Sequence, residues 1–184
     1  LLLLEERRHQ DAGEERPISG QGTVRELASP SGVWIVRDVS PNGHTLLLNR
    51  QPLDTAAFSL SLDGVQKEPK SLLPTGDVIS HPSFSPDGGW IMFTASAAGS
   101  ERGGIYTGGG IHVQEYPGPG LRKQVTSRGN YPVWRKDGKE IVFLDDYQGR
   151  NHIWSVPVDV SGGELRAGNA SAQFPDRLPA TPYG

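Results

Sequence analysis

The sequence predicts an all-β protein, built as a partial β-propeller of four-stranded antiparallel blades. A motif that ends in Asn-Gly or Asp-Gly and precedes an apolar strand occurs three times. The copies lie 45 and 50 residues apart, measured between Asn42, Asp87 and Asp137, and a period of ~40–50 residues with several strands per unit is typical of propeller blades. Gly (24 residues) and Pro (15 residues) exceed a fifth of the 184 residues, which favours many turns over long helices.

The motif and the segment after it define the first two strands of each blade. The three turns are Val39-Ser-Pro-Asn-Gly43, Phe84-Ser-Pro-Asp-Gly88 and Trp134-Arg-Lys-Asp-Gly138. Asn-Gly and Asp-Gly tolerate the left-handed backbone angles of a tight hairpin. The second strands are Leu46-Leu-Leu48, Ile91-Met-Phe93 and Ile141-Val-Phe143. Apolar residues at consecutive positions indicate burial on both faces, as expected between two neighbouring blades.

The third strands follow at a matching offset in two of the three repeats. Phe58 lies 16 residues after Asn42, and Ile153 lies 16 residues after Asp137. Ile111 lies 24 residues after Asp87, so the middle repeat contains eight extra residues. Fourth strands are expected at 67–73, 121–126 and 171–174.

These strands divide the chain into three full blades and two partial ends. The expected units are an N-terminal segment with the last strand of a preceding blade (1–27, strand 23–27), blade 1 (28–74), blade 2 (75–126) with an inserted loop (96–110), blade 3 (127–175) and the start of a further blade (176–184). Propellers typically have four to eight blades. We therefore expect the ring to be completed by the rest of a longer chain or by self-association. An antiparallel β-sandwich is the alternative fold.

Composition excludes several classes of partner. The net charge is −3 and the Lys and Arg residues are scattered, so we expect no nucleic acid and no anionic membrane as partner. The chain has no Cys, which excludes disulfides and thiolate zinc sites. Leu1-Leu-Leu-Leu4 is far shorter than the ~20 apolar residues that span a bilayer. We expect a frayed terminus or the end of a preceding strand there, with the stub of a longer apolar segment as the alternative.

No motif in the sequence predicts catalysis. The chain has no Gly-x-Ser-x-Gly segment after a strand, which a nucleophile elbow requires, and its five His residues form no pair at metal-ligand spacing. His81 aligns with Val36 and Tyr131 at the inner end of the first strands, where we expect a structural His, with a channel ligand as the alternative. Asp145-Asp146 has only Asn151 and Tyr147 as nearby oxygen donors, so we expect solvated turn acids there, with a calcium site, which needs about 6–8 oxygens, as the alternative. The expectation is no catalytic residue, no metal and no cofactor.

The inserted loop is the feature that departs most from the repeat. In a four-stranded blade, loops before the first strand and after the second emerge on one face, so 96–110 lies beside 75–80 and 126–130. We call these three segments the insertion rim. Insertions on one face of a repeat array often mark the binding face. Residues expected to supply charge and aromatic surface there are Arg102, Tyr106, Arg128, Tyr131, Asp146 and Arg150. An ordinary tolerant loop is the alternative.

The repeats resemble the WD40-like, TolB-type β-propeller repeat (PD40), marked by an aromatic residue, Ser-Pro-Asp-Gly and an apolar strand. The turn at Phe84 matches fully, the turn at Val39 has Asn for Asp, and the turn at Trp134 has Arg-Lys for Ser-Pro. Three segments are similar to propellers of large bacterial proteins, many attached to a serine/threonine kinase or a DNA-binding domain. They are Val113-Gln-Glu-Tyr-Pro-Gly-Pro-Gly120, Pro132-Val-Trp-Arg-Lys-Asp-Gly-Lys-Glu140 and Gly163-Glu-Leu-Arg-Ala-Gly168.

This resemblance covers about 33–179 and implies a non-catalytic protein- or ligand-binding module. TolB is a periplasmic scaffold that binds protein partners, so the resemblance favours a scaffold or sensor domain of a larger bacterial protein and an extracytoplasmic compartment. One alternative is the propeller domain of a prolyl-oligopeptidase-like hydrolase whose catalytic domain lies outside these residues. A propeller hydrolase or lyase with a channel metal is a third class, and it needs several inward His or carboxylate side chains.

Overall fold

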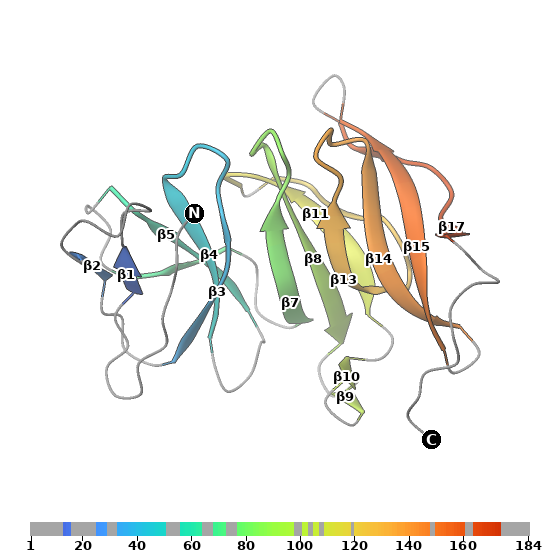
Figure 1. Cartoon of the computed structure of the whole chain (residues 1–184), viewed down its shortest axis with the longest axis horizontal. Helices are drawn as coiled ribbons and strands as arrows, with labels where there is room; N and C mark the ends of the chain where they lie inside the picture. Colours follow the sequence, from blue (N-terminus) through green and yellow to red (C-terminus); the bar gives the residue numbers. More distant parts are fainter. Residues whose placement is uncertain are drawn as a thin grey trace.

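The structure is a computed structural model in which every regular element described is a β-strand (Figure 1). It describes residues 13–15, 25–28, 33–50, 56–63, 68–72, 77–97, 101–102, 105–106, 109–118, 120–147, 150–160 and 164–173. Of 13–15, 25–28, 101–102, 105–106, 146–147 and 150–151 it describes the backbone alone. Within these ranges no helix has the length and apolar character needed to cross a membrane. The all-β prediction is confirmed.

Three antiparallel sheets follow one another along the chain and lie side by side (Figure 1). The first contains β3 (Trp34–Val39), β4 (Thr45–Arg50), β5 (Ala57–Ser61) and β6 (Lys70–Ser71). The second contains β7 (Asp77–Phe84), β8 (Trp90–Ala97), β11 (Gly110–Glu115) and β12 (Arg122–Gln124). The third contains β13 (Asn130–Trp134), β14 (Glu140–Tyr147) and β15 (Arg150–Asp159), and both β16 (Arg166–Ala167) and β17 (Ser171–Gln173) pair with β15. The first strands β3, β7 and β13 neighbour one another, and we call them the inner strands.

Two short hairpins lie outside the three sheets. β1 (Gly13–Glu15) pairs with β2 (Arg25–Ala28), which overlaps the strand expected at 23–27. β9 (Glu101–Arg102) pairs with β10 (Ile105–Tyr106) inside the predicted insertion. The residues 1–4 and the expected start of a further blade at 176–184 lie outside the described residues.

The apolar triplets of β4 and β8 are buried on both faces, as predicted, whereas in β14 Ile141 and Phe143 are buried but Val142, on the other face, is partly exposed. In β8, Phe93 packs with Ile79 and Ala57 toward the first sheet. Its neighbour Met92 packs in the cluster that contains Trp134 and residues of β14 in the third sheet. Both Met92 and Phe93 are 0 % exposed. Because successive strand residues point to opposite faces, this double burial means that β8 is enclosed between two sheets.

The three turns between first and second strands have one backbone shape but two kinds of support. The Gly that ends each turn, at 43, 88 and 138, has φ between 71° and 76°, a conformation that Gly adopts without steric cost. In the second turn, the Ser85 hydroxyl donates to Asp87 Oδ1 (2.5 Å) and accepts from the Trp90 N–H (2.9 Å). The first turn repeats this arrangement with Ser40 and Asn42.

In the third turn an ion pair replaces the missing serine. Arg135 donates through Nε and Nη2 to the two oxygens of Asp137, both at 2.8 Å, and through Nη1 to Glu140 at 2.6 Å. The hydrogen bonds from Arg135 to Asp137, together with one from the Lys139 N–H, lower the pKa of Asp137 to about 2. The loss of Ser-Pro from this repeat is therefore compensated by bidentate charge-assisted hydrogen bonding.

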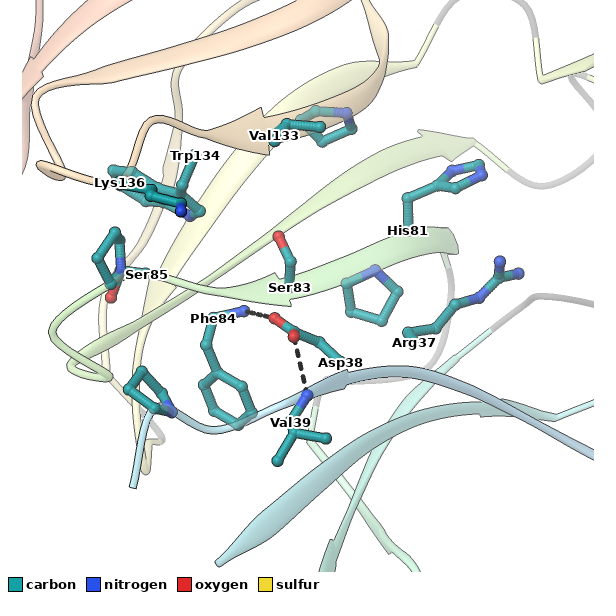
Figure 2. A pocket seen from close by; sticks show the side chains of 14 residues that line it. Arg37, Asp38, Val39, His81, Ser83, Phe84, Ser85, Val133, Trp134 and Lys136 are labelled. Atoms are coloured by element: carbon teal, nitrogen blue, oxygen red, sulfur yellow. Dashed lines mark hydrogen bonds between the residues drawn. The ribbon is translucent and has the colours of Figure 1, made fainter. Parts of the chain in front are cut away.

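Two polar side chains of the first sheet, the partly buried Asp38 and the buried Asn49, bind backbone groups of the second. Asp38 Oδ2 accepts from the Phe84 N–H (2.7 Å), while its Oδ1 accepts from the Val39 N–H (2.8 Å; Figure 2). Asn49 is 0 % exposed, and its Nδ2 donates to the carbonyls of Ala56 (2.8 Å) and Ile79 (3.2 Å). These bonds fix the position of β7 against β3 and β4.

Candidate functional site

The structure brings the ends of the strands that flank the insertion rim to one end of the sheets (Figure 1). Ala97 at the end of β8 pairs with Asp77 at the start of β7, and Leu144 of β14 pairs with Asn130 of β13. The insertion starts two residues later than predicted, because β8 continues through Ala97. Since β11 begins at Gly110, the connection between the two strands is 98–109.

Of the six predicted rim residues, the structure describes the side chains of Arg128 and Tyr131. Arg128 Nη2 lies 3.0 Å from Asp145 Oδ2, and the Asp145 side chain is 13 % exposed. Asp145, expected to be a solvated turn acid, is thus paired and largely buried. The side chains of the other four residues lie outside the description. Their backbones place Arg102 on β9, Tyr106 on β10, Asp146 on β14 and Arg150 on β15, so their common role at the rim stays a prediction.

His81 and Tyr131 hold the same position in the second and third inner strands, as their alignment in the sequence predicts. Each lies at a break in strand register and has φ of 53°. Positive φ is uncommon outside Gly and is retained only where the surrounding structure enforces it. The rings contact each other, with centroids 4.4 Å apart, so β7 and β13 are in side-chain contact at this position.

A hollow of about 710 Å³ lies between the inner strands and the turns that follow them (Figure 2). Two sets of repeat-equivalent residues form much of its wall. The first set lies two residues before Val39, Phe84 and Trp134, and it consists of Arg37, Pro82 and Pro132. The second set lies two residues after the same three positions, and it consists of Pro41, Pro86 and Lys136. Each set contains two prolines and one cation. His81 and Trp134 also line the hollow.

The charged side chains that line the hollow differ in their contacts with the rest of the protein. Arg37 Nε donates to the buried Asn49 Oδ1 at 2.8 Å, which fixes the direction of the Arg37 side chain. Lys136 is exposed and makes no ion pair with another described residue. Among the described lining residues Asp38 is the one carboxylate, and each of its oxygens accepts a backbone N–H. The hollow is therefore cationic and apolar.

His112 lies in a separate charged group on the second sheet. Arg122 Nε donates to His112 Nδ1 (3.2 Å), and Arg122 Nη1 contacts Asp77 Oδ2 at 2.7 Å. Burial, and then the charge of Arg122, lower the pKa of His112 from 6.5 to about 4, although Asp77 opposes the shift. The described residues contain no group of three or more His, Cys, Asp or Glu side chains able to hold a metal ion.

The lowered pKa of His112 predicts a loss of stability in mild acid. Histidine in an unfolded chain binds a proton at about pH 6.5, whereas folded His112 binds it near pH 4. The unfolded state therefore binds more protons between these values, and the free energy of unfolding should fall as pH drops from 6.5 to 4. Solvent at this half-buried side chain reduces the effect. In urea melts between pH 7.5 and 4, the free energy of unfolding of His112→Gln should fall less steeply with pH than that of the wild-type chain. An equal dependence on pH would contradict a lowered pKa of His112.

Sequence reasoning missed Arg37 and Lys136. Neither belongs to a known catalytic motif, and each lies in a repeat whose turn or strand was recognised for its structural role. A signal was present, because each is the cation at a repeat position that holds proline in the other two copies. Comparing the repeats position by position for departures, as well as for matches, would have found both residues.

The structure is similar to solved TolB structures. The match to TolB from Acinetobacter baumannii has a TM-score of 0.62 at 19% identity and covers 89% of this chain and 39% of that chain. The match to the putative TolB from Agrobacterium tumefaciens has a TM-score of 0.56 at 20% identity and covers 79% and 49% of the two chains. The chain thus spans half or less of the length of these proteins.

A third match is the tricorn protease, with a TM-score of 0.56 at 14% identity over 76% of this chain and 15% of that chain. No protein-family model matches the sequence, and no curated protein matches it. Likeness at this level of identity shows the fold. The chain is a partial β-propeller of the TolB-like fold.

Proposed function

We propose that this chain is a non-catalytic binding module, the propeller part of a scaffold or sensor in a larger bacterial protein. Its protein partner or ligand binds at the insertion rim. The remaining blades come from the rest of a longer chain or from a second copy. In keeping with the TolB-like fold, we propose an extracytoplasmic location, which fractionation of cells that express the parent protein would test.

The main observation in favour of this proposal is that the inserted hairpin β9–β10 follows a buried strand. The hairpin connects β8 and β11, and Trp90 through Ser96 of β8 are all buried. A loop displayed by such a buried strand can vary without unfolding the scaffold, and binding residues are commonly found on loops of this kind. The paired Arg128 and Asp145 stand at the same end of the sheets.

Replacing 98–108 with a short Gly-Ser turn tests the proposal. The replacement retains Ala97 and Gly110, the paired ends of β8 and β11, together with Gly109, where a Cβ would lie 2.9 Å from the Ala95 carbonyl oxygen. Closure entropy changes slowly with loop length, so the melting temperature should stay nearly unchanged. Binding of the partner that co-purifies with the full-length protein should be lost, as measured by pull-down and calorimetry.

The matched control is Lys139→Gln, an exposed change on the turn of the third sheet at the other end. It should leave partner binding intact. Retained binding after the 98–108 replacement, also when combined with Arg128→Gln, would place the site elsewhere and contradict the rim proposal. Loss of an enzymatic activity on His81→Ala would contradict the non-catalytic role itself.

The similarity to the tricorn protease supports a second candidate, a propeller that serves a hydrolase whose catalytic domain lies outside these residues. This candidate predicts a downstream α/β domain with Ser, Asp and His in the parent protein. It also predicts that deleting this propeller changes the size of peptide that the parent cleaves. A parent without such a domain and without peptidase activity would remove this candidate.

A further inference from the structure

We propose a second binding site, separate from the insertion rim: the hollow along the inner strands binds a small organic anion with an apolar body. The hollow measures about 710 Å³, within the usual ~300–1,000 Å³ of small-molecule sites. It lies on the half of the inner strands that leads into the Asn-Gly and Asp-Gly turns, away from the hairpin β9–β10 (Figure 1).

The composition of the two repeat-equivalent sets suits such a ligand. Four prolines, at 41, 82, 86 and 132, give a rigid apolar wall, and Arg37 and Lys136 interrupt that wall once in each set. The two cations come from opposite ends of the three-sheet array, one on β3 and one after β13. Figure 2 shows them on opposite sides of the hollow. A wall of this kind fits an apolar body flanked by cationic contacts.

The charged groups of the hollow are held in place by hydrogen bonds within the protein. Arg37 is oriented by Asn49, which is itself 0 % exposed and bound to two backbone carbonyls. The carboxylate of Asp38 is already committed to the N–H groups of Val39 and Phe84. It therefore competes poorly for an added cation, and the hollow favours a negative group. Charge-assisted bonds from an oriented guanidinium are stronger than neutral ones.

Two aromatic side chains line the hollow near Lys136. Trp134 lines the hollow together with Phe84, and in Figure 2 Lys136 lies next to Trp134. Both aromatic side chains are buried, at 8 % and 6 % exposure, because Trp134 packs in the cluster between the second and third sheets, and Phe84 packs with Leu47 of the first sheet and Ile91 of the second. A ligand with a planar apolar body meets fixed surfaces here and orders few protein side chains, which lowers the entropic cost of binding.

A pair of dyes with the same aromatic body tests this site. 8-Anilino-1-naphthalenesulfonate carries a sulfonate, and N-phenyl-1-naphthylamine carries no charge. Fluorescence titration of the folded chain should show tighter binding of the anionic dye, weakened by added salt. Lys136→Gln should weaken the anionic dye about three- to fivefold and Arg37→Gln about tenfold. Both variants should leave the neutral dye unchanged.

Lys139→Gln is the matched control, because it removes the same charge three residues from Lys136 outside the residues that line the hollow. It should bind both dyes like the wild-type chain. Equal affinity for the two dyes, or an affinity for the anionic dye that Lys136→Gln and Arg37→Gln leave unchanged, would overturn the proposal. An equal loss in Lys136→Gln and Lys139→Gln would also overturn it, since general charge attraction would then explain the binding. None of these results depends on the insertion rim.

Discussion

Replacing Phe93 or Phe143 with alanine is expected to lower the free energy of unfolding by about 3–5 kcal/mol. Phe93 is 0 % exposed and Phe143 is 3 % exposed. Phe93 packs toward the first sheet with Ile79, and Phe143 packs toward the second sheet in the cluster that contains Met92. Each ring therefore fills the space between two sheets, where neighbouring backbone cannot collapse into the cavity. Urea melts monitored by circular dichroism would measure the loss.

His112→Ala is the control for these two substitutions. His112 stacks on Phe93, with ring centroids 5.9 Å apart, but it is only half-buried. At pH 7.5 its replacement should cost far less than either phenylalanine. Equal shifts of the urea midpoint for all three variants would show that the sheets are not packed against each other as described.

The second large effect is expected for Asn49→Leu. Asn49 binds Arg37, the Ala56 carbonyl and the Ile79 carbonyl, so it joins the first sheet to the second. Leucine has a similar volume but no hydrogen-bonding group, and it leaves buried polar partners unsatisfied. Each such partner costs about 1–3 kcal/mol, so the free energy of unfolding should fall by about 2–4 kcal/mol.

Asn169→Leu provides the same chemical change at an exposed position. Its effect should stay within about 0.5 kcal/mol, as for most surface substitutions. A cost for Asn49→Leu no larger than this would mean that the polar contacts between the two sheets contribute nothing to stability. Thermal and urea unfolding of both variants, measured side by side, separate these outcomes.

The recurring parts of the fold were predictable because each depends on a short local pattern. The three Gly-terminated turns require left-handed angles at 43, 88 and 138, and Gly supplies them. The triplets at 46–48 and 91–93 are buried on both faces, and in the third triplet Ile141 and Phe143 are buried on one face. Since turn and strand recur together, their spacing also indicates a repeat array.

The register of the third strands was less predictable. Equal offsets from the turns made Phe58 and Ile153 equivalent, but Phe58 pairs with Leu48, and Trp154 pairs with Phe143. Leu48 and Phe143 are themselves equivalent, so the prediction at Ile153 was wrong by one residue. Connection length between strands is not encoded in the apolar pattern, and a slip of one residue moves side chains to the other face.

The hollow was not predictable from single motifs, because it forms only when three inner strands lie side by side. Arg37 and Lys136 are far apart in the sequence, and neither has a neighbour that suggests a shared site. The ion pair of Arg128 and Asp145 was unpredictable for the same reason, because it joins the connection before β13 to the end of β14. Contacts between repeats depend on packing and emerge only with the structure.

Hydrogen exchange of the full-length protein, with and without its co-purified partner, tests the central claim most directly. We expect the partner to slow exchange at 98–109, 75–80 and 126–130, while the turns at 41–44, 86–89 and 136–139 exchange as in the free protein. Protection confined to those turns, with none at the connection 98–109, would contradict the insertion rim as the binding surface.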